Sequence, residues 1–86
     1  MSVPKIFFPK GTTVKITKTT IKQGYKSSVE VGFVMIGRTK EDVKEGNSVE
    51  LDIGGGTSIV RKITETKSND LILETETSTY LLQAIV

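Results

Sequence analysis

The sequence contains no cysteine, no histidine and no tryptophan among its 86 residues, and only two prolines. Without cysteine there is no disulfide and no thiol nucleophile, and without either cysteine or histidine the usual zinc and iron–sulfur ligands and the usual general base are missing. These absences exclude most hydrolase chemistry. We therefore expect a protein that is not an enzyme and that carries no resident cofactor and no metal.

Long hydrophobic runs are also lacking. The apolar trio at residues 6–8, Ile-Phe-Phe, is bounded by Pro4 and Pro9 and is far too short for the core of a signal peptide or for a membrane span. The absence of cysteine fits a reducing compartment. We expect the protein to stay in the cytoplasm and to have no membrane partner.

Charge is divided unevenly along the chain, although the net charge is only +2. Residues 1–40 carry eight Lys or Arg against Glu30 alone, whereas residues 41–86 carry four against nine Asp or Glu. One interpretation is a basic face that attracts phosphate groups. The alternative is that the basic and acidic segments neutralise each other as neighbouring strands or across a subunit contact.

Apolar residues alternate with polar ones in six short segments separated by turn signals. The first has many β-branched residues and alternates at Val14 and Ile16, which predicts a strand with a solvated lysine face. The second is apolar on both sides towards its end, which predicts a strand covered on both faces. The fourth is expected to place Ile59, Arg61 and Ile63 on one face. The six segments are residues 12–21, 28–36, 49–53, 57–65, 71–76 and 79–86.

No stretch predicts a helix longer than a turn or two, and residues 39–45 are expected to be a connector. The pattern therefore predicts an all-β fold, a small antiparallel β-barrel or rolled sheet of about six short strands, SH3-like in style. The chain is expected to be a single domain over residues 1–86. Within it, residues 1–27 form a basic, Thr-rich strand with an N-terminal extension, and residues 28–86 form the core barrel.

A domain of this size buries a thin core, so pairing with further copies would help to stabilise it. If the barrel does not close, its edges must be paired with another subunit.

Residues 54–58, Gly-Gly-Gly-Thr-Ser, are the first candidate binding element. Glycine lets backbone N–H groups approach a phosphate closely, and two hydroxyls follow. The element lacks the rest of a P-loop, and a plain hairpin loop is the competing interpretation. Arg61 and Lys62 follow on the same strand, where Arg can hold a phosphate through two parallel hydrogen bonds or can simply be solvated.

Among the aromatic residues, Phe33 lies mid-strand among valines and is expected in the core, whereas Tyr25 and Tyr80 have polar neighbours and are candidates for stacking on a base. Glu74 and Glu76 project from one strand face. Two exposed carboxylates alone make a poor metal site.

Four pieces of residues 31–82 carry a resemblance to a known family. They are Val-Gly-Phe-Val-Met-Ile-Gly at 31–37, Val-x-x-Gly-x-x-Val-x-Leu at 43–51, Thr-Ser-x-Val-x-x-Ile at 57–63 and Thr-x-x-Ser-x-Tyr-x-Leu at 75–82. In these pieces the chain resembles the phage anti-CBASS sponges, small viral proteins that sequester cyclic-nucleotide immune signals. The basic N-terminal strand is not part of the resemblance.

The resemblance implies a viral, non-enzymatic homo-oligomer, with a tetramer favoured, in the cytoplasm of the infected bacterial host. It would bind a cyclic dinucleotide such as 3′3′-cyclic GMP-AMP and block CBASS defence. A pocket for such a ligand needs cations, hydroxyl donors and aromatic or apolar faces. Arg61 is expected to bind phosphate, and Lys62 is the second candidate for this role. The expected ligand-binding residues are Thr57, Ser58, Arg61, Lys62, Thr75, Ser78 and Tyr80.

Two other functions remain open. Small β-barrels with Lys-rich strands bind single-stranded nucleic acid, and here Lys15, Lys18, Lys22 and Lys26 would carry that function. The second alternative is that the chain is a structural or adaptor protein of a phage, which would oligomerise and bind no small molecule.

Overall fold

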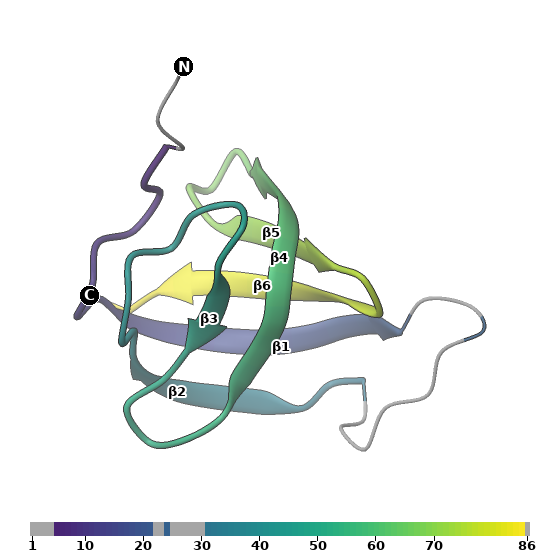
Figure 1. Cartoon of the computed structure of the whole chain (residues 1–86), viewed down its shortest axis with the longest axis horizontal. Coiled ribbons are helices and arrows are strands. Elements are labelled where there is room, and N and C mark those ends of the chain that lie inside the picture. The colour runs from purple at the N-terminus through teal and green to yellow at the C-terminus, as the bar shows by residue number, and fades with distance from the viewer. Residues whose placement is uncertain (1–4, 22–23, 25–30, 86) are drawn as a thin grey trace.

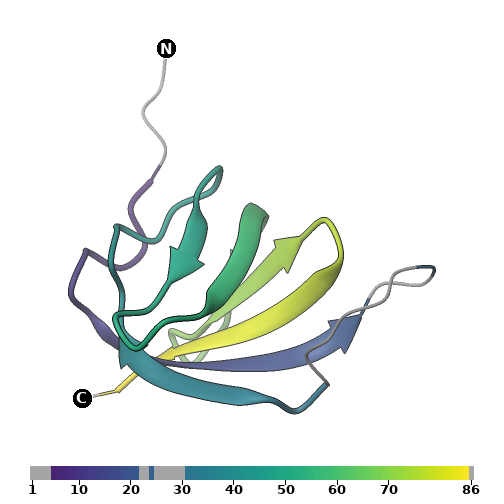
Figure 2. The same ribbon diagram turned by 60° about the horizontal axis from the view of Figure 1, so that its bottom comes forward.

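Six antiparallel strands form one curled sheet in the computed structural model, which describes residues 5–21, 24 and 31–85. The order across the sheet is β2-β1-β6-β5-β4-β3, and the sheet bends into a half-barrel (Figures 1 and 2). The prediction of an all-β rolled sheet of about six strands is confirmed. The strands are β1 Thr13–Ile21, β2 Val34–Arg38, β3 Ser48–Glu50, β4 Gly56–Glu65, β5 Leu71–Thr75 and β6 Ser78–Ala84.

The two edges of the sheet approach each other at one place only among the described residues. Just after β2 and β3, Thr39 and Leu51 form an antiparallel bridge. It is flanked by hydrogen bonds from Lys40 N to Glu50 O at 2.9 Å and from Asp52 N to Arg38 O at 2.9 Å. The roll is therefore closed at the carboxyl end of β2, while the beginning of β2 stays at an open edge (Figure 2).

The core lies on the concave side of the sheet. β1, in the interior of the sheet between β2 and β6, contributes Val14 and Ile16, while β5 and β6 contribute Leu73 and Leu82. Burial of each such side chain contributes about 1.5–3 kcal/mol. The buried hydrophobic residues are Val14, Ile16, Val43, Val49, Leu51, Val60, Ile63, Leu71, Leu73, Tyr80 and Leu82.

The second predicted strand is shorter and more exposed than expected. β2 begins only at Val34, after Gly32 at φ 93°, and residues 28–30 lie outside the described part. The expectation that both faces are covered is wrong, because β2 is an edge strand and Val34 and Ile36 are exposed. Phe33 is also not a core residue, since 46% of it is exposed at the open end of the roll.

A bulge in β4 changes which of its residues face the core. The register of β4 on β5 shifts between Val60 and Lys62, so that Arg61 is the extra residue. Val60 and Ile63 are buried, whereas Ile59 is exposed. The predicted common face of Ile59, Arg61 and Ile63 is therefore wrong, because the bulge interrupts the strict alternation.

Lys18 is buried rather than solvated. It follows Val14 and Ile16 on the inward face of β1 and is only 1% exposed. The prediction of a solvated lysine face fails at this residue, because positions 14, 16 and 18 share one side of the strand. Its Nζ lies 5.9 Å from the ring centroid of Tyr80 on the neighbouring strand.

Candidate functional site

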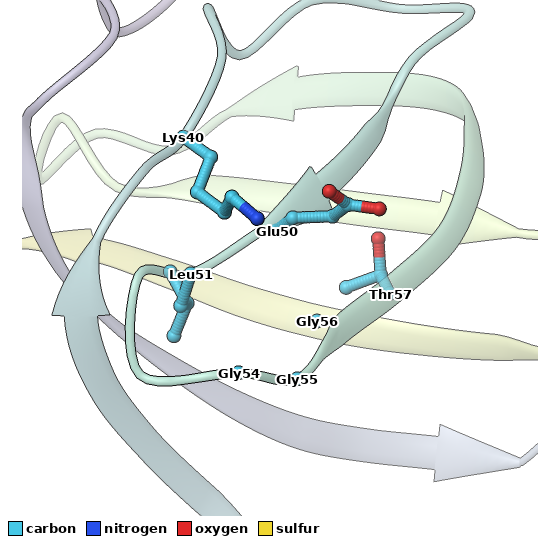
Figure 3. A pocket seen from close by; sticks show the side chains of 7 residues that line it. All are labelled: Lys40, Glu50, Leu51, Gly54, Gly55, Gly56 and Thr57. Atoms are coloured by element: carbon cyan, nitrogen blue, oxygen red, sulfur yellow. The ribbon is translucent and has the colours of Figure 1, made fainter.

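A hollow of about 410 Å³ lies at the turn between β3 and β4 (Figure 3). Its volume is within the range of about 300–1,000 Å³ that is usual for small-molecule sites. The bridge between Thr39 and Leu51 brings the residue after β2 next to the end of β3. The hollow is lined by Lys40, Glu50, Leu51, Gly54, Gly55, Gly56 and Thr57.

The three glycines of this turn are each required by the backbone. Gly54 and Gly55 have φ of 85° and 109°, a region that other residues seldom adopt. A Cβ on Gly56 would lie 2.1 Å from Val49 O, inside the strand pair. Hydrogen bonds from Gly54 N to Leu51 O and from Leu51 N to Gly55 O, both 3.0 Å, close the turn. The hairpin interpretation thus accounts for the glycines, which also leave bare backbone at the wall of the hollow.

Lys40 and Glu50 give the hollow one group of each charge (Figure 3). Both residues are exposed. The ion pairs found in the described part of the chain join Lys5 to Glu65 and Arg61 to Glu76. The Lys40 ammonium is therefore not held in an ion pair by Glu50. It remains available to an anion that enters the hollow.

Thr57 is the predicted site residue that lines the hollow. Its hydroxyl accepts a hydrogen bond from Val49 N at 3.2 Å and donates one to Ser58 O at 2.7 Å. Ser58 itself is exposed. Lys40 and Glu50 were not among the predicted site residues, because the closure that brings them together is a tertiary contact.

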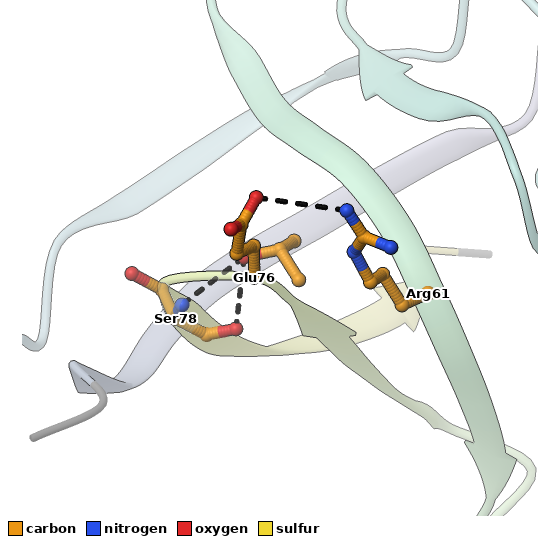
Figure 4. Close-up of polar contacts among 4 residues, drawn as sticks. Arg61, Glu76 and Ser78 are labelled. Atoms are coloured by element: carbon orange, nitrogen blue, oxygen red, sulfur yellow. Dashed lines mark hydrogen bonds and ion pairs between the residues drawn. The ribbon is translucent and has the colours of Figure 1, made fainter. Parts of the chain in front are cut away.

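Arg61 lies further along β4, at the bulge, and its Nη2 is 3.6 Å from Glu76 Oε2 (Figure 4). Both side chains are more than 60% exposed, at 67% and 63%. Exposed ion pairs of this kind contribute about 0–1 kcal/mol, so an anionic ligand could displace the carboxylate at little cost. Lys62 is exposed and lies opposite Glu74 on β5.

Thr75 and Ser78 flank the turn between β5 and β6, and both are buried. The Thr75 hydroxyl donates to Ser78 O at 3.0 Å and accepts from Ser78 N at 3.1 Å. Ser78 Oγ lies 3.5 Å from Thr77 Oγ1. These hydroxyls therefore take part in the turn, and their expected donation to a ligand stays a prediction.

Tyr80 is 9% exposed and belongs to the core, with its ring below the Lys18 ammonium. Tyr25 lies outside the described residues. The structure thus places five of the seven predicted ligand-binding residues in two groups. Thr57 and Ser58 lie at the beginning of β4, beside the hollow. The second group lies where the middle of β4 meets the β5–β6 turn, because Val60 pairs with Thr75. It consists of Arg61, Thr75 and Ser78.

Comparisons with known proteins give no match: no family model, no curated protein and no solved structure matches this chain. Within residues 5–21, 24 and 31–85 there is no group of acidic residues, His or Cys that could hold a metal ion. The same residues include no helix with the length and apolar character needed to cross a membrane.

Proposed function

We propose that this protein is a non-enzymatic sponge for a cyclic dinucleotide such as 3′3′-cyclic GMP-AMP, made by a phage to block CBASS defence in the host cytoplasm. The observation that carries the proposal is the hollow at the β3–β4 turn, which Lys40 lines together with Gly54–Thr57. The resemblance of residues 31–82 to the phage sponges supports the same ligand class.

The lining of the hollow suits the parts of such a ligand. The Lys40 ammonium attracts a phosphate, and glycine backbone allows the phosphate to approach closely. Glu50 can accept hydrogen bonds from the N–H groups of a guanine edge, since a carboxylate is purely an acceptor. Leu51 offers an apolar contact to a base or ribose.

The proposed action is to hold the nucleotide without changing it. The sequence has no histidine or cysteine to serve as the common general base or nucleophile. Binding alone is sufficient for a sponge, because it lowers the concentration of free signal.

Lys40→Ala is expected to weaken binding of 3′3′-cyclic GMP-AMP by about 10–100-fold, because a hydrogen bond to a charged group contributes about 1.5–3 kcal/mol. The measurement is isothermal titration calorimetry. Lys67→Ala removes another exposed lysine, from the turn between β4 and β5, and serves as the control. Equal affinities of the two variants would remove Lys40 from the site.

Arg61→Ala is expected to weaken binding by more than about tenfold and to leave the far-UV circular dichroism spectrum unchanged, since the side chain is exposed. Glu76→Gln is the matched variant. It releases Arg61 from its ion pair and is expected to tighten binding. An unchanged affinity of Arg61→Ala would confine the ligand to the hollow at the beginning of β4.

Single-stranded nucleic acid is the competing ligand class, and salt separates the two. Affinity for a single strand falls steeply with salt, whereas a cyclic ligand with two charges gives a shallow slope. Burial of Lys18 removes one of the four lysines expected to contact a strand, and Lys22 and Lys26 lie outside the described residues.

A further inference from the structure

β2 forms one edge of the sheet, and its first part has no strand beside it among the described residues. Lys18 N donates to Phe33 O, and Thr39 N donates to Thr12 O. In an antiparallel pair the backbone groups of successive residues point alternately towards and away from the partner strand. The N–H and C=O groups of Val34 and Ile36 therefore point away from β1, towards the open edge.

Arg38 follows Val34 and Ile36 in this alternation, and its outward N–H and C=O groups already have hydrogen-bond partners within the chain. Arg38 N donates to Asp52 Oδ1 at 3.0 Å, and Arg38 O accepts from Asp52 N at 2.9 Å. The open edge thus ends at the closure of the roll. Within residues 5–21, 24 and 31–85, the backbone groups of Val34 and Ile36 are the ones that this edge leaves without a partner strand.

The side chains at this edge are apolar and exposed. Val31, Phe33, Val34 and Ile36 are 55%, 46%, 42% and 52% exposed. Residues 31–37 contain no charged residue and no proline. Soluble proteins usually protect an exposed edge with a charge, a proline or a bulge, so an edge without any of them favours strand pairing.

The opposite edge of the sheet is protected in the usual ways. β3 has three residues, its pairing with β4 is irregular, and its exposed residue Glu50 is charged. Its carboxyl end is covered by the Thr39–Leu51 bridge. The lack of protection is therefore particular to β2.

We infer that the β2 edge pairs with the β2 edge of a second copy of this chain, in antiparallel orientation about a two-fold axis. A second copy suits this edge because its uncharged segment places no like charges opposite one another, and a two-fold axis presents the same patch on both sides. The two half-barrels then share one continuous sheet. This inference does not depend on the proposed nucleotide ligand.

The outward backbone groups determine the register. Val34 must exchange both hydrogen bonds with Ile36 of the second copy, and Met35 then faces Met35 of the second copy across the axis. The pairing is confined to residues 34–36 of each copy, because the side chains of Asp52 and Ile53 already lie within 3.4 Å of the Cβ position of Gly37. On the convex face, the exposed side chain of Val34 in one copy is then buried against that of Ile36 in the other copy.

Two substitutions test the pairing by light scattering coupled to size exclusion, with no nucleotide present. The wild-type chain is expected to have twice its 9.4 kDa mass, or an even multiple of that mass. Ile36→Lys places an ammonium in the contact and is expected to halve the assembled mass. Ile59→Lys adds the same charge at a residue of similar exposure, 57%, on β4 and is expected to assemble as the wild type does.

The register has its own test, because the chain contains no native cysteine. Met35→Cys places two cysteines opposite each other in a non-hydrogen-bonded pair, with Cα atoms about 4.5 Å apart, close enough for a disulfide. Oxidation is expected to give a covalent dimer, whereas Ile59→Cys is expected to stay uncrosslinked. A monomeric wild type, an assembly that Ile36→Lys leaves intact, or equal crosslinking of the two cysteine variants would overturn the inference.

Discussion

Gly56→Ala is expected to destabilise the fold by about 3 kcal/mol or more, at the upper end of the cost of overpacking. The added Cβ would lie 2.1 Å from Val49 O and 2.9 Å from Glu50 Cα. Both atoms belong to the backbone of β3, which is paired with β4, so neither can rotate away. For a domain of this size the melting temperature should fall by roughly 12–24 °C, as measured by thermal unfolding.

Gly54→Ala is the matched control in the same turn. Gly54 has φ of 85° but no atom within 4 Å of its Cβ position, so the substitution costs only the backbone strain of about 1–2 kcal/mol. If Gly56→Ala and Gly54→Ala have the same melting temperature, the close approach of β3 and β4 at Gly56 is contradicted.

Lys18→Ala is expected to destabilise the protein by about 2–5 kcal/mol, as the truncation of a buried Leu, Ile or Met to alanine does. Lys18 is the largest fully buried side chain among the described residues, and its ammonium lies over the ring of Tyr80. The substitution removes both the packing of the aliphatic stem and the contact of the cation with the ring. Urea unfolding measures the loss.

Lys15→Ala gives the comparison on the same strand. Lys15 faces outward and is half-buried, and its removal is expected to change the free energy of unfolding by about 0.5 kcal/mol or less. Equal stability of the two variants would contradict the burial of Lys18.

The strands were largely predictable because alternation of apolar and polar residues is a local signal. In the segment at residues 49–53, Val49 and Leu51 are buried and Glu50 is exposed, as the alternation predicts. The prediction fails at its end, because the strand stops at Glu50 and Ile53 is 63% exposed in the turn that follows. Lys18 carried the same signal, since it lies two residues after Ile16 and four after Val14, on the face of the strand that is buried. Its charge led to the opposite prediction, a side chain in solvent. The bulge at Arg61 leaves no mark in the sequence, because any residue can be the extra one.

The exposure of β2 depends on the order of the strands, which alternation does not determine. A strand with two apolar faces is typical of the interior of a sheet, and β2 instead lies at the edge. The candidate site was predictable only in its local part, the turn with Gly54 and Thr57. Lys40 joins it through the bridge between Thr39 and Leu51, a contact between segments that are distant in the sequence.

The most direct test of the account is calorimetry with a panel of cyclic di- and trinucleotides, followed by heat denaturation of the complex and identification of what is released. The account predicts tight, saturable binding of a cyclic dinucleotide with a shallow salt dependence, and recovery of the ligand intact. Absence of binding to every member of the panel, or release of a cleaved nucleotide, would contradict it.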